Sequence, residues 1–291
     1  MSSLAVLLVN PVAGSYKKDN VRLAEEILKR KGLITEVLLS KEKGEIEDLA
    51  RSSIGMSPEM VFVLGGDGTF NEAVNGLVNT EIPVAFIPTG TTNVLARELD
   101  IPNNVSMAVE RAVSSGVHKI SLGRVSDYSK NVRYFVMMAG IGFDAATVCS
   151  VNRRLKGLLG KGAYILSGLK VLKNYEPEPI VVRSDDVESV GYSVIVGNGS
   201  YYGGGFRITP DASLFSPYFY VFVLKNEKRI SLIRTFAGLL TSTHLNYQYV
   251  SYFRTQTLHL QGTSHIHVDG DYLGKLPVDI TVERDCLNLL C

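Results

Sequence analysis

The stretch Val61–Gly76, with the sequence VFVLGGDGTFNEAVNG, decides the fold of the N-terminal part of this chain. Its apolar residues end at Leu64, two glycines, an aspartate and a third glycine follow, and an amphipathic run begins at Thr69. A short apolar run that stops at a glycine turn is typical of a buried parallel strand. Thr69 has Glu72 three residues later, which is the spacing of a helix-capping box. The stretch therefore predicts a strand, a glycine turn and a helix.

The glycine turn also predicts a phosphate site. Such a turn points backbone N–H groups and a helix N-terminus at an anion, and glycines let the backbone approach that anion closely. Asp67 stands inside the turn, where a carboxylate about 5 Å from a phosphate would be repelled by about 3 kcal/mol at an effective dielectric of about 20. A cation such as Mg²⁺ between the charges would remove this repulsion, and Asp67 could instead handle a proton. The alternative is that Asp67 only caps the helix.

The composition indicates a folded protein that is not a dedicated nucleic-acid binder. The chain has 291 residues, of which 45% are hydrophobic and 20% charged, so it can bury a core, and its length favours two domains. Its net charge of +1 argues against a nucleic-acid partner. Cys149, Cys286 and Cys291 lack metal-ligand spacing and are expected to be reduced thiols of a cytosolic protein. The apolar run Leu4–Val9 is too short for a signal peptide or a membrane span.

Strands and helices alternate up to about Ser121, which predicts a parallel α/β domain. Strands are expected at 4–9, 35–39, 61–64 and 83–87, and helices at about 21–28, 46–54 and 106–115 besides the helix after the glycine turn. The fourth strand runs into PTGTTNVLAREL at 88–99, which repeats the order of strand end, glycine, hydroxyls and helix. Two such turns at successive strand ends would face one crevice.

After about Ser121 the pattern changes to successive strands joined by short turns. Strands are expected at 133–139, 180–183, 192–196, 218–224, 247–253, 255–260 and 264–268, with helical patterns near 144–155, 163–172 and 230–242. The pattern predicts an α/β domain at 1–121 and a mostly antiparallel β domain at 122–277. The last strand, 278–283, could belong to either domain, and the tail at about 278–291 could return to the first.

Between Val151 and Tyr175 every charged residue is positive. These residues are Arg153, Arg154, Lys156, Lys161, Lys170 and Lys173. Basic residues around an apolar, glycine-containing segment suit an anionic membrane surface. A solvated helix face over core leucines explains the same pattern equally well.

The stretch His265–Asp271, with the sequence HIHVDGD, ends one of the expected strands. A period of two places His265, His267 and Asp269 on one face. Three alternating residues of one strand cannot all reach one ion comfortably, so we expect solvent-facing histidines rather than a zinc site. The Asp-Gly turn exposes Asp269 and Asp271, and a plain hairpin explains it without any function.

Together, these segments resemble the diacylglycerol kinase catalytic-domain family of bacterial lipid kinases, to which sphingosine and ceramide kinases are related. The matching segments, in the family's order, are NPVAG at 10–14, GGDGTFNEAVNG at 65–76, PTGTTNVLAREL at 88–99, AGIGFDA at 139–145, GNGSYYGGGFRITPDA at 197–212 and VDGD at 268–271. The resemblance implies an α/β N-terminal domain with a parallel sheet, like that of phosphofructokinases and NAD kinases. It also implies a mostly antiparallel β-sandwich C-terminal domain, with ATP between the two.

Carried over position by position, the resemblance implies an ATP site and a catalytic hairpin. The residues implied for ATP are Asn10, Pro11, Val12, Ala13, Gly14, Ser40, Gly65, Gly66, Asp67, Gly68, Thr69, Phe70, Asn71, Glu72, Thr91, Thr92 and Asn93. The Mg²⁺ that accompanies ATP is expected on Asp67, which we also count among the catalytic residues. The proton acceptor is expected in the hairpin turn, at Asp271 or at Asp269 beside it.

The chain departs from the family's pattern at three acidic positions. Asp271 replaces the glutamate of the family's Asp-Gly-Glu turn, and its side chain is one methylene shorter, which could shift the base by about 1 Å. Val94 and Ser121 stand where the family often has aspartates. Because NVLAREL is itself familiar among bacterial members, Val94 alone does not imply an inactive protein.

A fourth departure affects a second metal site. The family's structural Mg²⁺ site maps to Ser216 in this chain, with Ser213 and Tyr218 at the flanking carbonyl positions. Its aspartate is replaced by Ser216, and a neutral hydroxyl cannot balance the charge of a hard dication.

The implied activity is that of an ATP-dependent lipid kinase, with diacylglycerol as the default substrate and phosphatidic acid as the product. The resemblance implies a cytoplasmic protein that acts peripherally, at the inner face of the membrane, on a lipid at the membrane surface. An unpaired edge strand could pair two copies into a homodimer. Three alternatives stay open: a non-catalytic nucleotide- or lipid-binding homologue, an NAD kinase and a phosphofructokinase-like sugar kinase. Phosphatidylglycerol, undecaprenol-like alcohols and sphingoid bases are further substrates that the sequence allows.

Overall fold

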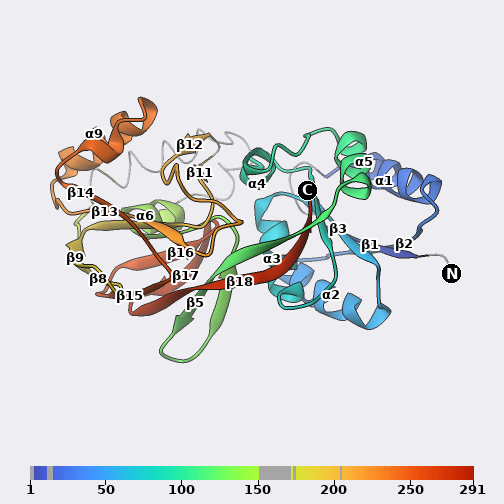
Figure 1. Ribbon diagram of the computed structural model, residues 1–291, viewed down its shortest axis with the longest axis horizontal. Helices are drawn as coiled ribbons and strands as arrows, with labels where there is room; N and C mark the ends of the chain where they lie inside the picture. The colour runs from blue at the N-terminus through green and yellow to red at the C-terminus, as the bar shows by residue number, and fades with distance from the viewer. Residues whose placement is uncertain (1–2, 12–15, 151–171, 173–174, 204) are drawn as a thin grey trace. The chain divides into compact units, whose positions relative to one another are not determined.

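The chain folds into two compact units (Figure 1). Unit 1 comprises Met1–Ile120 together with Arg284–Cys291, and unit 2 comprises Ser121–Glu283. The computed structural model describes residues 3–11, 16–150, 172, 175–203 and 205–291. Several predictions lie outside these residues. They are the ATP-site residues Val12, Ala13 and Gly14, all six basic residues of the segment 151–175, and the helical pattern at 163–172 apart from its last residue.

Unit 1 is built on a parallel sheet with the order β2-β1-β3-β4-β18. Its strands are β1 (Leu4–Val9), β2 (Ile34–Leu39), β3 (Met60–Gly65), β4 (Val84–Pro88) and the last part of β18 (Val278–Leu290). The strands β1, β3 and β4 are buried almost throughout, as continuous apolar runs require when helices cover both faces of a sheet. Leu289 of β18 pairs in parallel with Val84 of β4.

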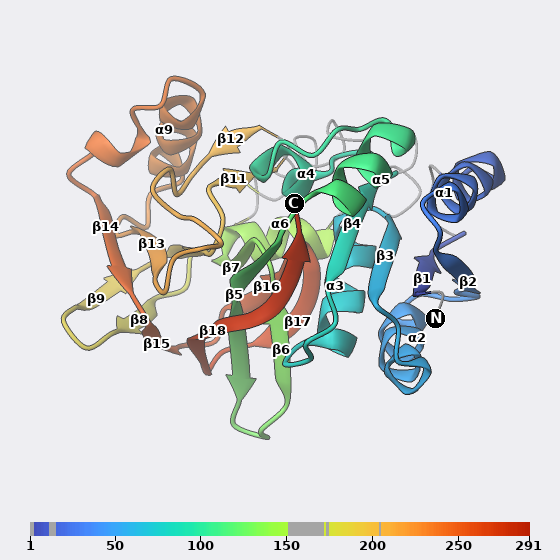
Figure 2. The ribbon, with the colours of Figure 1, turned by 45° about the vertical axis from the view of Figure 1, so that its right-hand side comes forward.

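Helices cover both faces of this sheet. They are α1 (Lys18–Arg30), α2 (Glu45–Ser53) with the short 3-10 helix η1 (Ile54–Met56), α3 (Asp67–Leu77), α4 (Val94–Glu98) and α5 (Val105–Ser114). Helices α1 and α5 lie together on one face, and α2 and α3 lie together on the other (Figures 1 and 2). The buried residues of α1, which are Val21, Ala24, Ile27 and Leu28, follow the helical period on one side.

The helix after the first glycine turn begins two residues earlier than the sequence predicts. Helix α3 starts at Asp67 with Gly66 as its N-cap residue, and no side chain caps it. The predicted capping box of Thr69 and Glu72 is therefore wrong, because Thr69 lies within the first turn of α3 and is buried. Glycine has no side chain that could accept from the first N–H groups of a helix. These groups of α3 therefore stay available to other acceptors.

The described residues of unit 2 form a six-stranded antiparallel sheet and the antiparallel part of the ten-stranded sheet that continues through β18. The six-stranded sheet has the order β14-β13-β10-β7-β16-β17. Its strands are β7 (Met138–Gly142), β10 (Ser193–Gly197), β13 (Phe219–Leu224), β14 (Val250–Thr255), β16 (His265–Val268) and β17 (Asp271–Lys275). The antiparallel part of the ten-stranded sheet contains β5 (Val117–Asp127), β6 (Val132–Phe135), β8 (Ile180–Arg183), β9 (Glu188–Gly191), β15 (Thr257–Gln261) and the first part of β18. A short hairpin joins β11 (Tyr201–Tyr202) to β12 (Phe206–Arg207).

The two sheets bury one hydrophobic core between them. Ile141, Val196 and Val221 reach it from the six-stranded sheet, and Val182 and Leu258 reach it from the other, all of them fully buried. Alternate residues of the strands supply these side chains, as in other β-sandwiches. The predicted fold class, a parallel α/β part followed by a mostly antiparallel β-sandwich, is confirmed.

Helices α6 (Phe143–Ser150) and α9 (Arg229–Leu240) accompany the sandwich in the described part of unit 2. Helix α6 packs beside β7 and β16, while α9 follows β13 and contacts β12 and the 3-10 helix η2 (His244–Asn246) (Figure 2). In the described part of the chain, no helix has both the length and the apolar character needed to cross a membrane.

Candidate active site

Asp67 links the two glycine turns of unit 1. Its Oδ1 accepts a hydrogen bond from the backbone N–H of Leu95 in α4 (3.1 Å). Burial raises the pKa of Asp67, and the backbone donors at Leu95, Val94 and Asn93 lower it by less than burial raises it. The aspartate therefore caps α4, and its own backbone N–H at the start of α3 also binds the carboxylate. Its carboxylate lies between the turn after β3 and the turn after β4.

Glycines let these two turns pack against each other. A Cβ added at Gly90 would lie 2.5 Å from Cα of Gly66 and 2.7 Å from Oδ1 of Asn93. The backbone N–H of Thr89 also donates to the carbonyl of Gly65 (2.9 Å). The prediction that both turns serve one site is consistent with this packing, since only glycines allow backbones to approach so closely.

Replacing Gly90 with alanine should destabilise unit 1, whereas Gly68 should tolerate alanine. The new methyl group at position 90 would overlap the backbone of Gly66, and overpacking of this kind lowers the free energy of unfolding by about 1–3 kcal/mol. A Cβ at Gly68 would meet nothing within 4 Å, and alanine there should add about 0.5–1 kcal/mol because Gly68 lies in α3. Urea unfolding of both variants measures the difference, and equal midpoints would contradict the packing described.

The other described nucleotide residues predicted in unit 1 fall into three groups, the first of which lies at strand ends. Asn10 and Ser40 follow β1 and β2, at the same end of the sheet as the glycine turns. Asn10 Nδ2 donates to Thr69 Oγ1 (3.3 Å), and Ser40 Oγ is buried without a hydrogen-bond partner among the described residues. Pro11 follows Asn10 and is half-buried. These positions lie at the carboxyl ends of parallel strands, where α/β sheets bind ligands.

The second group lies inside α3 and serves its packing. Phe70, Asn71 and Glu72 are only 1%, 2% and 5% exposed. The ring of Phe70 packs on Phe86 of β4 at a centroid distance of 5.0 Å. Phe70 therefore holds α3 against β4, while Asn71 Oδ1 accepts from Asn75 Nδ2 within α3 (3.1 Å).

The turn after β4 presents two threonines to solvent. Thr91 is exposed and Thr92 half-buried, while Asn93 is buried and adopts a left-handed backbone with φ of 48°. Asn93 Nδ2 donates to the carbonyl of Gly90 (3.0 Å), which closes the turn. Asparagine is among the few residues that adopt this conformation readily.

In unit 2, the turn between β16 and β17 is fixed by Asp269. Both turn residues, Asp269 and Gly270, have positive φ values of 47° and 84°, as a two-residue hairpin turn requires. The carboxylate of Asp269 accepts backbone hydrogen bonds from Val136 (2.6 Å), Met137 (3.0 Å) and Met138 (2.9 Å). These bonds explain why the predicted strand 133–139 is broken, since the N–H groups between β6 and β7 bind a carboxylate instead of a neighbouring strand.

A buried chain of hydrogen bonds supports the same turn. His267 Nε2 lies 2.6 Å from Oδ2 of Asp144, and the backbone N–H of Gly270 donates to His267 Nδ1 (3.2 Å). Because Nδ1 accepts, the proton of the ring is on Nε2, which donates to Asp144. The hydroxyl of Tyr202 donates to the other oxygen of Asp144. Burial alone would raise the pKa of Asp144, but the His267 imidazole and the Tyr202 hydroxyl together hold it below its ordinary value.

The prediction of two solvent-facing histidines is wrong for His267, which is 2% exposed. The pairing register shifts between Ile266 and His267, and such bulges re-aim side chains. The opposite residue, Gly140, leaves the space that the ring needs, because a Cβ there would lie 2.3 Å from His267 Nε2. The resulting chain Tyr202–Asp144–His267–Gly270 fixes the turn that precedes Asp271, whose partly exposed side chain begins β17.

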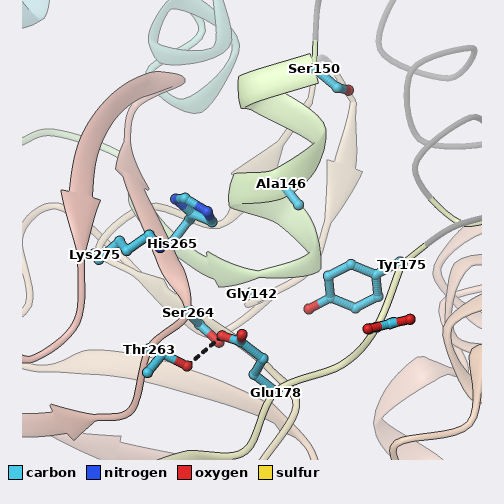
Figure 3. Close-up of a pocket in the computed structure, with 10 residues that line it drawn as sticks. Gly142, Ala146, Ser150, Tyr175, Glu178, Thr263, Ser264, His265 and Lys275 are labelled. Carbon is cyan, nitrogen blue, oxygen red and sulfur yellow. Dashed lines mark hydrogen bonds between the residues drawn. The ribbon is translucent and has the colours of Figure 1, made fainter.

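A cavity of about 410 Å³ lies in unit 2 beside α6 (Figure 3). It is lined by Gly142, Ala146, Ser150, Tyr175, Glu176, Glu178, Thr263, Ser264, His265 and Lys275. Thr263 donates to Glu178 Oε2 (2.6 Å) at its edge. Asp271 and Lys275 are the first and last residues of β17, so about 13 Å of strand separates them. The cavity therefore lies at the opposite end of the hairpin from Asp271 and does not contain this candidate base.

Both halves of the chain match models of known protein families. Residues 4–125 match the diacylglycerol kinase catalytic domain, and residues 137–291 match the YegS C-terminal NAD kinase beta sandwich-like domain. The chain belongs to the diacylglycerol kinase family.

Known members of the diacylglycerol kinase family align over nearly the whole chain. A Staphylococcus carnosus protein named as a candidate lipid kinase is 31% identical over 264 residues, which cover 87% of this chain and 84% of that protein. A Mycobacterium tuberculosis diacylglycerol kinase is 28% identical over 291 residues, which cover 97% of this chain and 93% of that protein. A crystal structure of a candidate diacylglycerol kinase from Bacillus anthracis has a TM-score of 0.81 at 24% identity and covers 99% of this chain and 97% of that one. This last likeness concerns the fold alone.

At the positions implied for the second metal site, both serine hydroxyls have partners within the turn. Ser213 Oγ accepts from the backbone of Phe215 (3.4 Å), and Ser216 Oγ accepts from the backbone of Tyr218 (3.2 Å), so both hydroxyls serve the turn itself. The guanidinium of Arg254 lies over the Tyr218 ring at 5.0 Å. Throughout the described ranges, no group of three His, Cys, Asp or Glu residues could hold a metal ion. A dication would find a neighbouring cation here and no carboxylate at position 216.

Proposed function

We propose that this chain is an ATP-dependent lipid kinase that phosphorylates a lipid hydroxyl, with diacylglycerol as substrate and phosphatidic acid as product. The observation that carries the proposal is the packing of two glycine turns at the ends of β3 and β4, beside the N-terminus of α3. Such an arrangement binds phosphate groups through backbone N–H donors. Membership of the diacylglycerol kinase family supplies the class of acceptor.

The residues of unit 1 would bind the nucleotide. The turns at 65–68 and 89–93 would receive the phosphates, with Thr91 and Thr92 as hydroxyl donors and Asn10 and Ser40 at neighbouring strand ends. Asp67 fits the role of a Mg²⁺ ligand, directly or through water, because its carboxylate is already held in place by α4. Mg²⁺ bound there would neutralise charge on the β- and γ-phosphate oxygens.

Asp271 would accept the proton of the lipid hydroxyl as the hydroxyl oxygen attacks the γ-phosphorus and the bond to ADP breaks. Asp271 is favoured over Asp269 because the Asp269 carboxylate binds three backbone N–H groups. A carboxylate with so many donors is a weak base. General-base catalysis contributes about 10²–10⁴-fold to the rate, and positioning and charge stabilisation supply the rest. We place the reaction at the inner surface of the membrane, where the lipid presents its hydroxyl.

A second candidate function is that of a nucleotide- or lipid-binding homologue without catalysis. It is favoured by the neutral residues Val94, Ser121 and Ser216 at positions where the family often has acids. Ser121 is buried in β5, and its carbonyl accepts from Asn198 Nδ2 (2.8 Å). It is therefore part of the packing of unit 2.

Phosphoryl transfer from radiolabelled ATP separates these functions. The purified protein is incubated with a total lipid extract, with dioleoylglycerol in mixed micelles and with NAD, each in the presence of Mg²⁺. We expect a labelled lipid that migrates as phosphatidic acid in the micelle reaction and no labelled NADP. Tight ATP binding without any labelled lipid would support the binding homologue and contradict the kinase, and labelled NADP would show an NAD kinase instead.

A further inference from the structure

Helix α9 of unit 2 presents its large apolar side chains to solvent. Its outward positions include Ile230 (48% exposed), Ile233 (49%), Phe236 (45%) and Leu240 (58%). Its buried positions are Ser231, Thr235, Gly238 and Leu239. An ordinary surface helix has the opposite arrangement, with apolar residues against the core and polar residues outside.

This outward stripe is held in a fixed position. Gly238 lies against Tyr247, where an added Cβ would meet the ring at 2.8 Å, and Phe236 contacts Phe206 edge-on at a centroid distance of 6.0 Å. The guanidinium of Arg229 donates to the carbonyl of Tyr175 (2.8 Å). Because α9 is anchored by its small-residue side, the apolar stripe is displayed rather than folded against unit 2. Figures 1 and 2 both show α9 outside the strands of the sandwich. Apolar side chains that are gathered and displayed on one helix face indicate an interaction site.

The charged residues of α9 itself, Arg229 and Arg234, are both positive, and Lys228 immediately precedes them. Lys228, Arg229 and Arg234 are exposed on or beside the helix. The nearest acid before them is Glu227, and no aspartate or glutamate follows until Asp269. Apolar side chains flanked by basic residues suit the head-group region of an anionic bilayer.

We infer that α9 docks unit 2 onto an anionic lipid bilayer, with the stripe Ile230, Ile233, Phe236 and Leu240 at the boundary between head groups and acyl chains. The helix has 12 residues, so it is about 18 Å long and cannot span a bilayer core of about 30 Å. It would instead lie in the plane of the interface. The inference rests on the proposed function and deepens it, because a lipid kinase must meet its substrate at a bilayer.

A second copy of the chain fits the stripe less well than a bilayer does. In a symmetric pair the same patch faces itself. Lys228, Arg229 and Arg234 would then approach their own copies, with no acid on α9 to pair with them. Like charges across an interface oppose association, whereas anionic head groups attract all three.

Co-sedimentation with vesicles tests the inference. The triple variant Ile230→Ser, Ile233→Ser, Leu240→Ser, called the stripe variant, removes three of the four side chains of the stripe. The control Ile34→Ser, Met107→Ser, Val190→Ser removes apolar side chains of similar exposure elsewhere. Vesicles of phosphatidylcholine alone are compared with vesicles that contain about one third phosphatidylglycerol. We expect the stripe variant to bind the anionic vesicles about 100-fold more weakly, about fivefold for each half-exposed side chain, and the control to bind like the unchanged protein.

A charge variant tests the second half of the inference. Arg234→Glu should weaken binding about 30-fold on the anionic vesicles and little on neutral ones. The control Lys18→Glu makes the same charge change on α1 and should leave binding unchanged. Thermal midpoints establish that all four variants are folded.

Comparison of the variants can give results that would overturn the docking of α9. They are equal vesicle binding by the stripe variant and the unchanged protein, equal losses in the stripe variant and its control, and a dimer that the stripe variant dissociates while vesicle binding persists. Failure of the proposed function gives a different pattern. If the protein binds vesicles through α9 but phosphorylates no lipid, only the proposed kinase activity is contradicted. If it phosphorylates a short-chain diacylglycerol in micelles but does not bind vesicles, only the docking of α9 is contradicted.

Discussion

Replacing Asp67 with asparagine is expected to abolish phosphoryl transfer while making the protein more stable at neutral pH. Burial raises the pKa of Asp67 above its ordinary value of 3.8. Between pH 3.8 and the raised pKa, the unfolded state releases a proton that the folded state keeps. The free energy of unfolding therefore falls as the pH rises through this window, and the loss persists at higher pH. Asparagine keeps the oxygen that accepts from Leu95 but carries no charge, so it avoids this loss.

Urea unfolding and kinase assays measure the two effects together. We expect a gain in the free energy of unfolding at about pH 7 that disappears at about pH 3, and at least about a 10³-fold loss of phosphoryl transfer. Asp127→Asn is the control, because that exposed carboxylate has its pKa lowered by hydrogen bonds from Asn131 and should change stability in the opposite direction. A variant at position 67 that kept full transfer would remove Asp67 from the mechanism.

Asp271→Asn and Asp269→Ala are expected to fail in different ways. Asp271→Asn should lower kcat by about 10²–10⁴-fold, which is the usual contribution of a general base, and should leave the unfolding midpoint unchanged. Asp269→Ala removes the acceptor of three backbone N–H groups, and since hydrogen bonds to charged groups contribute about 1.5–3 kcal/mol each, it should cost at least about 3 kcal/mol of stability.

Steady-state kinetics beside urea unfolding distinguish these two roles. The kcat of each variant is measured with saturating lipid and ATP under conditions in which its folded fraction is known. If Asp271→Asn retained kcat while folded Asp269→Ala lost it, the assignment of the base to Asp271 would be wrong.

The sequence predicted most of the strands because their burial leaves a local pattern. The strands Leu4–Val9 and Ile180–Arg183 have the predicted bounds, since each is a short apolar run between polar residues. The broken strand at 133–139 could not be predicted in this way. Its break depends on Asp269, more than 130 residues away, and no periodicity within the strand records that contact. The early start of α3 has a similar cause, because Asp67 is held by α4.

The candidate site was predicted by motif, but its hydrogen bonds were not. Sequence reasoning left the choice between Asp269 and Asp271 open, and only the three backbone donors distinguish them. The chain Tyr202–Asp144–His267 was missed altogether. A signal for it exists in the segment AGIGFDA at 139–145, which contains Asp144. At its first glycine, Gly140, an added side chain would collide with Asp144 and His267. A glycine in a buried strand often marks space needed by a neighbour.

The return of β18 has a consequence for the order in which the protein can mature on the ribosome. Unit 1 is completed by Arg284–Cys291, which are translated after all of unit 2. Until then β4 is an uncovered edge of a sheet, and its apolar residues Val84–Ile87 would be open to pairing with other nascent chains. The first unit to begin synthesis is thus the last to be finished. Slow elongation through the sandwich would lengthen the period during which that edge can pair with other chains.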